Sequence, residues 1–338
     1  MNVHESAKLR HMLCVAGLEI ATSQSTADII IFQTCSIRDT AQRKALTHIS
    51  QAIKLKSSPF NKGGARRAGV FSPQICVIGC INKPIGGVDI QLGTNQLEIL
   101  VEKLTGTRPD TRFGMDNSII ITHGCENFCS YCIVPYVRGK EIHRPIEDIE
   151  FEFKEIVERG TPRVIYLLGQ NVNSYPNFVG LLDRLCKIDG DFTLNFLSSH
   201  PKDFDRTLVE CIARNPKIER NIHLPMQSGC DKILAAMNRR YTVAQFREKV
   251  DLLRARVPGV HITTDIICGF PGETEQDFQQ TVAVVKQIKF DAAFIFAYSP
   301  REGTLAAKMD GQLDTHEKKR RATKLIEIQR SLSSSGKS

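Results

Sequence analysis

Apolar and polar positions follow two different periods along the N-terminal third of the chain. Short apolar runs of strand type alternate with segments in which apolar side chains recur at helical spacing. We predict strands at 27–32, 75–78 and 88–93, and helices at 5–20, 39–55 and 95–104. This order predicts a small α/β domain with a parallel sheet over residues 1–106, with a basic surface loop at 56–74.

After a linker, a strand, a loop and a helix repeat six times. The strands are predicted at 118–123, 163–170, 192–198, 220–226, 260–268 and 291–298. The last helix of the series begins with a capping-box-like string at 274–277. Strands that alternate with helices form parallel sheets with right-handed crossovers, so we predict a partial (β/α)6 barrel over residues 115–330. Residues 331–338 are predicted to be a disordered tail.

Composition narrows the class of protein. The 338 residues are 41% hydrophobic and 24% charged, which is typical of globular proteins. No apolar run is long enough to cross a bilayer, and the first residues lack the apolar core of a secretory signal, so we expect a cytoplasmic protein. Eleven cysteines in that compartment favour metal or redox chemistry over disulfides. The net charge of +8 suits an anionic partner such as RNA, but a solvated basic surface explains it equally well.

The densest group of cysteines follows the first barrel strand. Cys125, Cys129 and Cys132 are separated by three residues and then two, and the loop lies at the carboxyl mouth, where barrel chemistry occurs. A structural zinc site takes a fourth protein ligand, which this run lacks. The spacing therefore favours a 4Fe–4S cluster that keeps one iron open for a small molecule. A zinc loop, or three unrelated cysteines, are the alternatives.

Other cysteines and polar clusters also follow predicted strands. Cys35 and Cys80 each end a strand, which puts both thiols at the carboxyl edge of one parallel sheet. Cys76 is predicted to be a core residue, and the helical patterns predict packing roles for Cys14, Cys186 and Cys211. The barrel strand ends carry polar or glycine clusters that include Gly169, Gln170, Asn171, Ser198, His200, His223, Gln227 and Gly269. For the two histidines, a structural role and a role in ligand binding are both open.

The cysteine spacing, with Tyr131 just before the last cysteine, resembles the signature of the radical S-adenosylmethionine (SAM) enzymes. The longer string from Gly124 through residues 133–139 to Pro145 resembles one branch of them, the tRNA methylthiotransferases, and the resemblance extends to about residue 330. It implies a 4Fe–4S cluster at the three cysteines with SAM on the open iron. It also implies that Gly169, Gln170 and Asn171 bind the SAM amino group and that Ser198, Gln227 and Gly269 lie where ribose and adenine bind.

The string at 167–175 resembles the methylthiotransferases that act on N6-isopentenyl-type adenosine beside the anticodon. The implied reaction is methylthiolation at C2 of that adenosine. The C2–H bond is not acidic enough for a general base, so a radical made by reductive cleavage of SAM breaks it. The implied partners are the tRNA anticodon arm and an electron donor such as flavodoxin or ferredoxin. Alternatives are a threonylcarbamoyl-adenosine or protein substrate, and a truncated relative that binds a cluster or tRNA without catalysis.

The resemblance also implies a second, auxiliary 4Fe–4S cluster held by three N-terminal cysteines. Cys35 and Cys80 match two of them, and the third lies in a Gly-Cys-x-Met-Asn string whose Met-Asn corresponds to the start of this chain. We therefore expect that cluster to be absent or labile. The family's C-terminal RNA-binding TRAM barrel has no counterpart, so we expect weak tRNA binding through the basic helix at 318–321.

Overall fold

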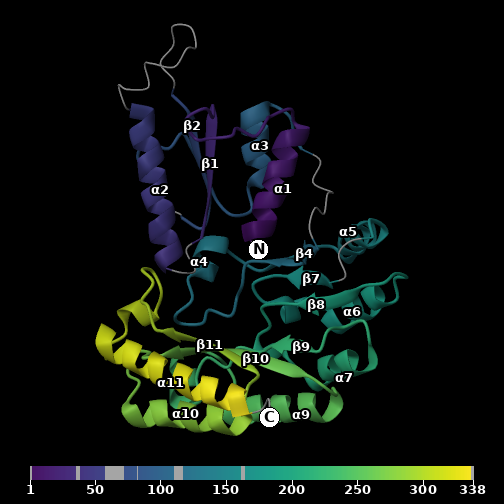
Figure 1. Ribbon diagram of the computed structural model, residues 1–338, viewed down its shortest axis with the longest axis vertical. Helices are drawn as coiled ribbons and strands as arrows, with labels where there is room; N and C mark the ends of the chain where they lie inside the picture. The colour runs from purple at the N-terminus through teal and green to yellow at the C-terminus, as the bar shows by residue number, and fades with distance from the viewer. Residues whose placement is uncertain are drawn as a thin grey trace. The chain divides into compact units, whose positions relative to one another are not determined.

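The structure is a computed structural model that describes residues 2–35, 39–57, 72–81, 83–109, 117–160 and 164–335. Contacts divide the chain into two compact units, Met1–Asp116 with Tyr136–Gly139, and Asn117–Pro135 with Lys140–Ser338. Each unit is built on parallel strands with helices, so the predicted α/β fold class is confirmed (Figure 1). Most of the predicted basic loop at 56–74 lies outside the described residues. No helix in the described ranges is long and apolar enough to span a membrane.

The N-terminal unit is a three-layered α/β structure. Its elements are α1 (Asn2–Val15), β1 (Ile29–Thr34), α2 (Asp39–Ser57), β2 (Gln74–Gly79), β3 (Ile90–Leu92) and α3 (Leu97–Thr105). The strands pair in parallel in the order β1-β2-β3. Successive β2 side chains point to opposite faces. Cys76 packs with α1 and α3 and Ile75 packs on the α2 side, so the sheet is covered on both faces (Figure 1).

Two predictions about packing cysteines in this unit had different outcomes. Cys76 is fully buried in the core beside Leu9 and Met12, as predicted. Cys14 is exposed near the end of α1, so the packing role predicted from its helical spacing is wrong. The buried stripe of that helix runs through Leu9 and Met12 and leaves Cys14 outside it.

The second unit begins at β4 (Ser118–Ile120) and follows the predicted alternation. Its further strands are β5 (Thr122–His123), β6 (Ile142–His143), β7 (Val164–Leu168), β8 (Thr193–Phe196), β9 (Asn221–His223), β10 (His261–Cys268) and β11 (Ala292–Ala297). The helices after residue 133 are α4 (Val134–Arg138), α5 (Ile146–Glu158), α6 (Phe178–Cys186), α7 (Arg206–Arg214), α8 (Asp231–Ala236), α9 (Val243–Arg256), α10 (Glu275–Ile288) and α11 (Thr315–Ser335). Short 3-10 turns occur at Val172–Ser174 (η2), Pro201–Asp203 (η3) and Ala306–Lys308 (η4).

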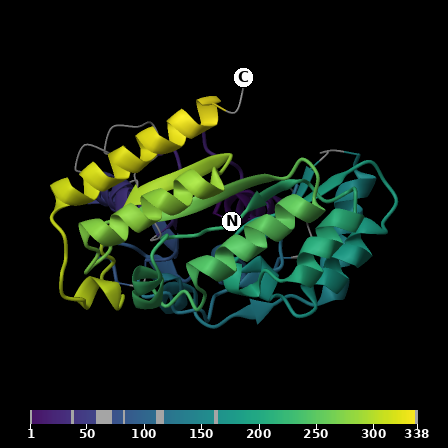
Figure 2. The same cartoon turned by 90° about the horizontal axis from the view of Figure 1, so that it is seen from below.

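Six parallel strands form the partial barrel. They pair as β4-β7-β8 and β9-β10-β11, and a parallel bridge between Leu194 and Ile218 joins the two groups. Helices α9, α10 and α11 lie along one face of β9, β10 and β11 (Figures 1 and 2). The main hydrophobic core fills the space between strands and helices. All carboxyl strand ends therefore face the same edge of the unit, as the alternation predicts.

The ends of several elements depend on specific side chains. Thr274 and Asp277 form the capping box expected at the start of α10. The strand predicted at 118–123 is divided into β4 and β5, and the antiparallel pairing of β5 with β6 is not predicted from the sequence. Helix α11 continues to Ser335, so a disordered tail is the wrong prediction for residues 331–335. Ser333 supports this last turn because its hydroxyl donates to the Gln329 carbonyl; residues 336–338 lie outside the described ranges.

Candidate active site at the barrel mouth

The loop that carries the three cysteines is held firmly at its centre. The Ser130 amide donates to the Met237 carbonyl at 3.0 Å, and the Ser130 hydroxyl donates to the Ala236 carbonyl at 2.8 Å. The Ser130 carbonyl in turn accepts from the Ala306 amide at 2.8 Å. The loop after β5 is thereby fixed between the end of α8 and η4. This anchoring presents Cys125, Cys129 and Cys132 at the carboxyl mouth.

The three thiols interact electrostatically with one another. Burial raises the pKa of Cys132 to about 12; a bond from the Val134 amide opposes this effect, and the neighbouring Cys129 and Cys125 add to it. Burial likewise raises the pKa of Cys125, and Cys129 contributes. Like charges on neighbouring sulfurs disfavour thiolates. Without metal, Cys125 and Cys132 are therefore protonated, and metal binding releases their protons.

The described residues contain no group of three or more His, Cys, Asp or Glu side chains arranged to hold a single metal ion. Cys129 nevertheless lies close enough to Cys125 and Cys132 to contribute to the raised pKa of both.

Two polar side chains that the sequence analysis missed contact the cysteines. Asn127 Nδ2 donates to Cys125 Sγ at 3.5 Å, and Arg239 Nη1 donates to Cys129 Sγ at 3.3 Å. Asn127 could have been noticed because it lies inside the cysteine loop. Arg239 follows α8, far along the chain, and only the fold brings it to the loop. Both supply donors to sulfur, which stabilises thiolate ligands.

The structure distinguishes the two histidines whose role the sequence leaves open. His200 Nε2 lies 4.0 Å from Cys129 Sγ, and its Nδ1 accepts from the Lys202 amide at 3.1 Å. Burial, with Arg239 and Lys202, lowers the pKa of His200 to about 2, so the ring is neutral and Nε2 carries the proton. His200 therefore belongs to the cysteine site.

His223 has a structural environment. Its Nδ1 lies 2.9 Å from Thr263 Oγ1, and its Nε2 lies 3.2 Å from Asp265 Oδ2. Both ring nitrogens thus have partners on the neighbouring strand β10. These contacts favour the structural alternative for this residue.

The end of β7 forms a polar cradle. A Cβ atom at Gly169 would lie 2.1 Å from Thr122 Oγ1, so only glycine fits there. Asn171 is almost completely buried; its Nδ2 donates to Asp203 Oδ2 at 2.8 Å, but within the described residues its Oδ1 has no partner. The same is true of the buried hydroxyls of Thr122 and Ser199. Unpartnered buried oxygens are rare in proteins, and these fit a polar ligand.

The predicted ribose and adenine positions share an unusual backbone. Ser198, Gln227 and Gly269 follow β8, β9 and β10, and all three have positive φ, at 71°, 66° and 74°. Such conformations are strained for Ser and Gln and often mark functional sites. Gly269 differs from the other two because the space of its missing side chain is filled by Lys318, and its amide donates to Glu273. Its glycine is therefore explained by packing.

The two N-terminal cysteines lie side by side. Thr34 and Gly79 are partners at the ends of β1 and β2, and Cys35 and Cys80 follow them directly. The Cys80 amide donates to the Thr34 carbonyl at 3.3 Å. Gly79 has φ of +129°, and a Cβ there would lie 2.3 Å from the Thr34 carbonyl oxygen. The predicted place at the carboxyl edge of the sheet is thereby confirmed, and their role as metal ligands stays a prediction.

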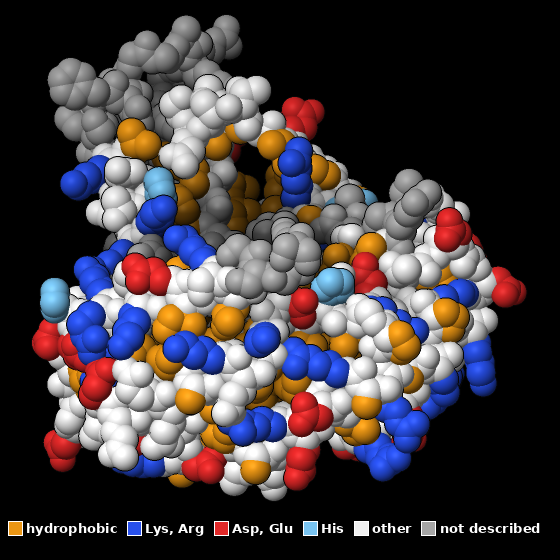
Figure 3. Space-filling model, turned by 60° about the horizontal axis from the view of Figure 1, so that its bottom comes forward, with side chains coloured by type: hydrophobic (Ala, Val, Ile, Leu, Met, Phe, Trp, Pro, Cys, Tyr) orange, Lys and Arg blue, Asp and Glu red, His pale blue; other side chains and the backbone are white. Residues whose placement is uncertain are grey.

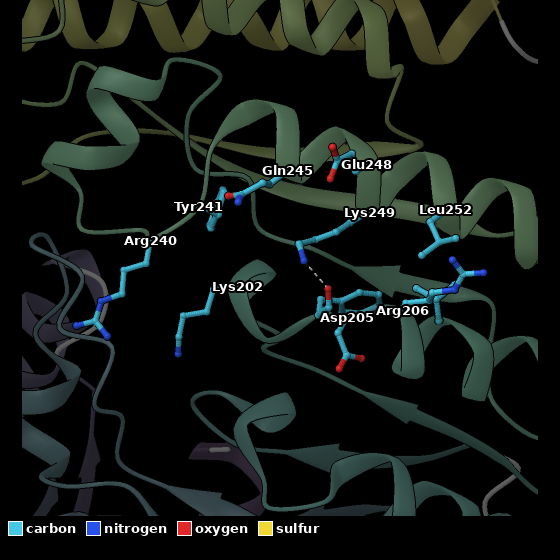
Figure 4. A pocket seen from close by; sticks show the side chains of 11 residues that line it. Lys202, Asp205, Arg206, Arg240, Tyr241, Gln245, Glu248, Lys249 and Leu252 are labelled. Carbon is cyan, nitrogen blue, oxygen red and sulfur yellow. Dashed lines mark hydrogen bonds between the residues drawn. The ribbon is translucent and has the colours of Figure 1, made fainter.

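A basic pocket of 360 Å³ lies beside the cysteine loop. Figure 4 shows Lys202 and Arg240 extending in the same direction, while Lys249 reaches the Phe204 carbonyl at 2.7 Å. Lys202 also donates to Asn127 Oδ1 at 2.8 Å, which links the pocket to the loop. Arg240 is exposed and has no hydrogen-bond or ion-pair partner within the described ranges.

The basic helix expected to bind RNA is largely paired internally. Arg320 forms ion pairs with Glu317 and Glu275, and the buried Arg321 pairs with Glu273. Lys318 is also buried. Over the barrel helices drawn in Figure 3, blue and red side chains intermix. The string at 318–321 therefore offers fewer charges to a phosphate backbone than its sequence suggests.

Comparisons with known proteins agree with this architecture. Residues 119–285 match the model of the radical SAM superfamily, and residues 1–88 match that of the uncharacterized protein family UPF0004. The cobalamin-dependent SAM radical enzyme OxsB, solved with aqua-cobalamin and SAM, superposes with a TM-score of 0.56 at 11% identity over 97% of this chain and 50% of its own. The radical SAM methyltransferase TsrM from Kitasatospora setae superposes with a TM-score of 0.50 at 16% identity, over 68% of this chain and 43% of its own. The fold and the cysteine loop define a radical SAM protein.

Curated relatives narrow the class. The tRNA-2-methylthio-N(6)-dimethylallyladenosine synthase of Fusobacterium nucleatum is 39% identical over 97% of this chain and 81% of its own length. The synthase of the same name from Moorella thermoacetica is 41% identical over 98% of this chain and 81% of its own length. The chain belongs to the radical SAM tRNA methylthiotransferase family that these relatives represent. A 4Fe–4S cluster and SAM are the cofactors of this family, and the three thiols and the unpartnered oxygens at the mouth fit them.

Proposed function

We propose that the protein adds a methylthio group to C2 of an N6-isopentenyl-type adenosine beside the anticodon of tRNA. The observation that carries the proposal is the three-cysteine loop at the barrel mouth, in a chain 39% identical to such a synthase over nearly its whole length. A 4Fe–4S cluster held by Cys125, Cys129 and Cys132 would supply the electron for reductive cleavage of SAM, given a low-potential donor such as flavodoxin or ferredoxin. Radical chemistry suits this substrate because the C2–H bond resists a general base.

The protein's own residues bind and orient. Cys125, Cys129 and Cys132 are the ligands of the cluster, and their loop is anchored through Ser130. Asn171 Oδ1 and the Ser199 hydroxyl are available to the polar groups of SAM. Ser199 is an addition to the SAM-binding positions expected from the sequence. Gly269 is a weaker candidate for SAM binding, because Lys318 occupies the space beside it.

The basic pocket beside the cysteine loop is the best candidate for a contact with the tRNA backbone. Arg240 has no carboxylate partner within the described residues, in contrast to Arg320 of α11. A phosphate contact at Arg240 would lower tRNA affinity uniformly when removed, with a salt slope smaller by about one. Arg240→Ala and, as a control outside the pocket, Arg320→Ala test this in a filter-binding series at several salt concentrations, because Arg320 is already paired with Glu275 and Glu317. Equal salt slopes for Arg240→Ala and the unchanged protein would contradict the contact.

The test of the proposed function is analysis of tRNA nucleosides. The chain is expressed in a bacterial host that lacks its own methylthiotransferase, and tRNA is digested and analysed by mass spectrometry. The expected product is the 2-methylthio derivative of the isopentenyl-type adenosine, absent with Cys129→Ala. Methylthiolated threonylcarbamoyl-adenosine would instead identify the other tRNA substrate. SAM cleavage without any methylthio nucleoside would identify a relative that has lost the transfer reaction.

A further inference from the structure

Arg239 is a buried cation that has no carboxylate partner in the part of the chain that the structure describes. The residue is only 4% exposed. Its guanidinium donates to Cys129 Sγ and Tyr131 Oη, both at 3.3 Å, and to the Pro225 carbonyl at 3.0 Å. It also donates to Tyr241 Oη at 3.2 Å. Within the described residues, none of its partners is Asp or Glu. A buried charge is strongly disfavoured unless it is paired.

The other buried arginines of the described residues do have carboxylate partners. Arg321 pairs with Glu273 at 2.8 Å, and within the N-terminal unit Arg138 pairs with Glu5 at 3.4 Å. Among the described residues Arg239 is the exception, and of its partners there only Cys129 becomes an anion when it binds metal. The negative charge that compensates Arg239 is therefore the thiolate and whatever the thiolate binds.

The segment that carries Arg239 is fixed to the cysteine loop itself. Asn238 Nδ2 donates to the Asn127 carbonyl at 3.2 Å and to the Phe128 carbonyl at 3.0 Å. Asn238 adopts φ of 56°, which turns the chain sharply before Arg239. The guanidinium lies over the Tyr241 ring, 5.4 Å from its centroid. These contacts hold the cation in one place beside Cys129.

We propose that Arg239 is a positioning residue that holds Cys129 and raises the reduction potential of the 4Fe–4S cluster bound at this loop. The inference rests on the proposed function, because it concerns the cluster of that same site. A cluster gains one negative charge when a low-potential one-electron donor reduces it. A fixed cation beside a ligand sulfur stabilises the more negative, reduced form more than the oxidised one. Arg239 thus favours the electron transfer that SAM cleavage needs.

The test is a redox titration of the reconstituted full chain, followed by electron paramagnetic resonance without SAM or tRNA. Arg239→Gln keeps donors but removes the charge, and we expect about tenfold less favourable reduction, which is about 59 mV lower for one electron. Arg239→Lys keeps the charge but cannot reach Cys129 and Pro225 together, and we expect about a threefold effect, or about 28 mV. Arg321→Gln, the matched control, removes a buried guanidinium outside the site and should leave the potential unchanged.

The outcomes separate the inference from the function on which it rests. A potential that falls from the unchanged protein through Lys to Gln supports the inference. If Arg239→Gln holds iron at an unchanged potential, Arg239 is only structural and the inference is wrong. If that variant holds no iron, Arg239→Lys decides: a lowered potential supports the inference, and an unchanged one overturns it. If the unchanged protein itself binds no cluster, the proposed function fails, and the inference with it.

Discussion

The two cysteine sites of this protein are built in different ways. At the barrel mouth, three thiols lie on one short loop, and Arg239, Asn127 and His200 surround them. In the N-terminal unit, Cys35 and Cys80 come from strands far apart in sequence and meet because Thr34 and Gly79 are paired. The first site is local, and the side chains of Asn127 and Arg239 donate hydrogen bonds to its sulfurs. The second depends on the register of one sheet and contributes two thiols from the described residues.

This difference predicts unequal metal binding. A loop with three ligands and donors to sulfur binds a cluster tightly, because such outer partners contribute about 10–100-fold to metal affinity. Two thiolates at a sheet edge hold a cubane weakly or need a further ligand. The sites should therefore respond differently to the same substitution.

The largest expected effect is on SAM cleavage. Cys129→Ala should lower 5′-deoxyadenosine production with dithionite by more than about 100-fold, since even an outer partner is worth up to that factor. Cys211→Ala removes a thiol from the hydrophobic core and serves as the matched control, with cleavage retained. Unchanged cleavage in Cys129→Ala would remove the loop from the mechanism.

The second prediction compares the sites directly through iron content. After anaerobic reconstitution and a chelator challenge, the chain should keep about four irons, the content of one cubane. Cys125→Ala should lose them, whereas Cys80→Ala should keep them. About eight resistant irons in the unchanged chain, falling to four in Cys80→Ala, would show that another ligand completes the N-terminal site.

The sequence predicts the local site better than the distributed one. The spacing of Cys125, Cys129 and Cys132 lies within one loop, so the pattern alone indicates a cluster. The alternation of apolar runs and helical segments likewise predicts the six parallel strands. Arg239 could not be predicted, because its contact with Cys129 spans 110 positions and depends on packing after α8. The ion pairs of Arg320 with Glu275 of α10 and of Arg321 with Glu273, in the loop before α10, also depend on tertiary contacts.

The third prediction concerns the sheet edge on which the N-terminal site depends. Gly79→Ala forces a positive φ and a Cβ within 2.3 Å of the Thr34 carbonyl oxygen, so we expect a loss of about 1–3 kcal/mol in the free energy of unfolding of that unit. Hydrogen exchange of β1 and β2 amides measures the loss. Gly86→Ala is the control, since nothing lies within 4 Å of its Cβ and its φ is not positive. Equal exchange in both variants would show that the edge tolerates the added atom.

The smallest expected effect concerns the barrel unit, and it is a pH-dependent change in the free energy of unfolding. Burial alone would raise the pKa of Asp277, but bonds from Lys232 and from Thr274 outweigh it and hold the pKa below its usual range. A carboxyl with a lowered folded-state pKa stabilises the fold above the unfolded pKa of about 3.9, and this contribution is lost as the pH falls further. Asp277→Asn should therefore lower the free energy of unfolding by about 1 kcal/mol at pH 7.

The same variant should approach the stability of the unchanged protein below about pH 4, because the amide has no proton to take up. Urea unfolding followed by hydrogen exchange of α10 amides measures this, since it separates the barrel from the N-terminal unit. Glu275→Gln, at an exposed position of the same helix turn, is the control and should change stability by less than about 0.5 kcal/mol. If the deficit of Asp277→Asn persisted unchanged at low pH, packing rather than the carboxylate would explain it. If the deficit appeared equally in the amides of β1 and β2, the two units would unfold together. Their two cysteine sites would then not be independent of each other.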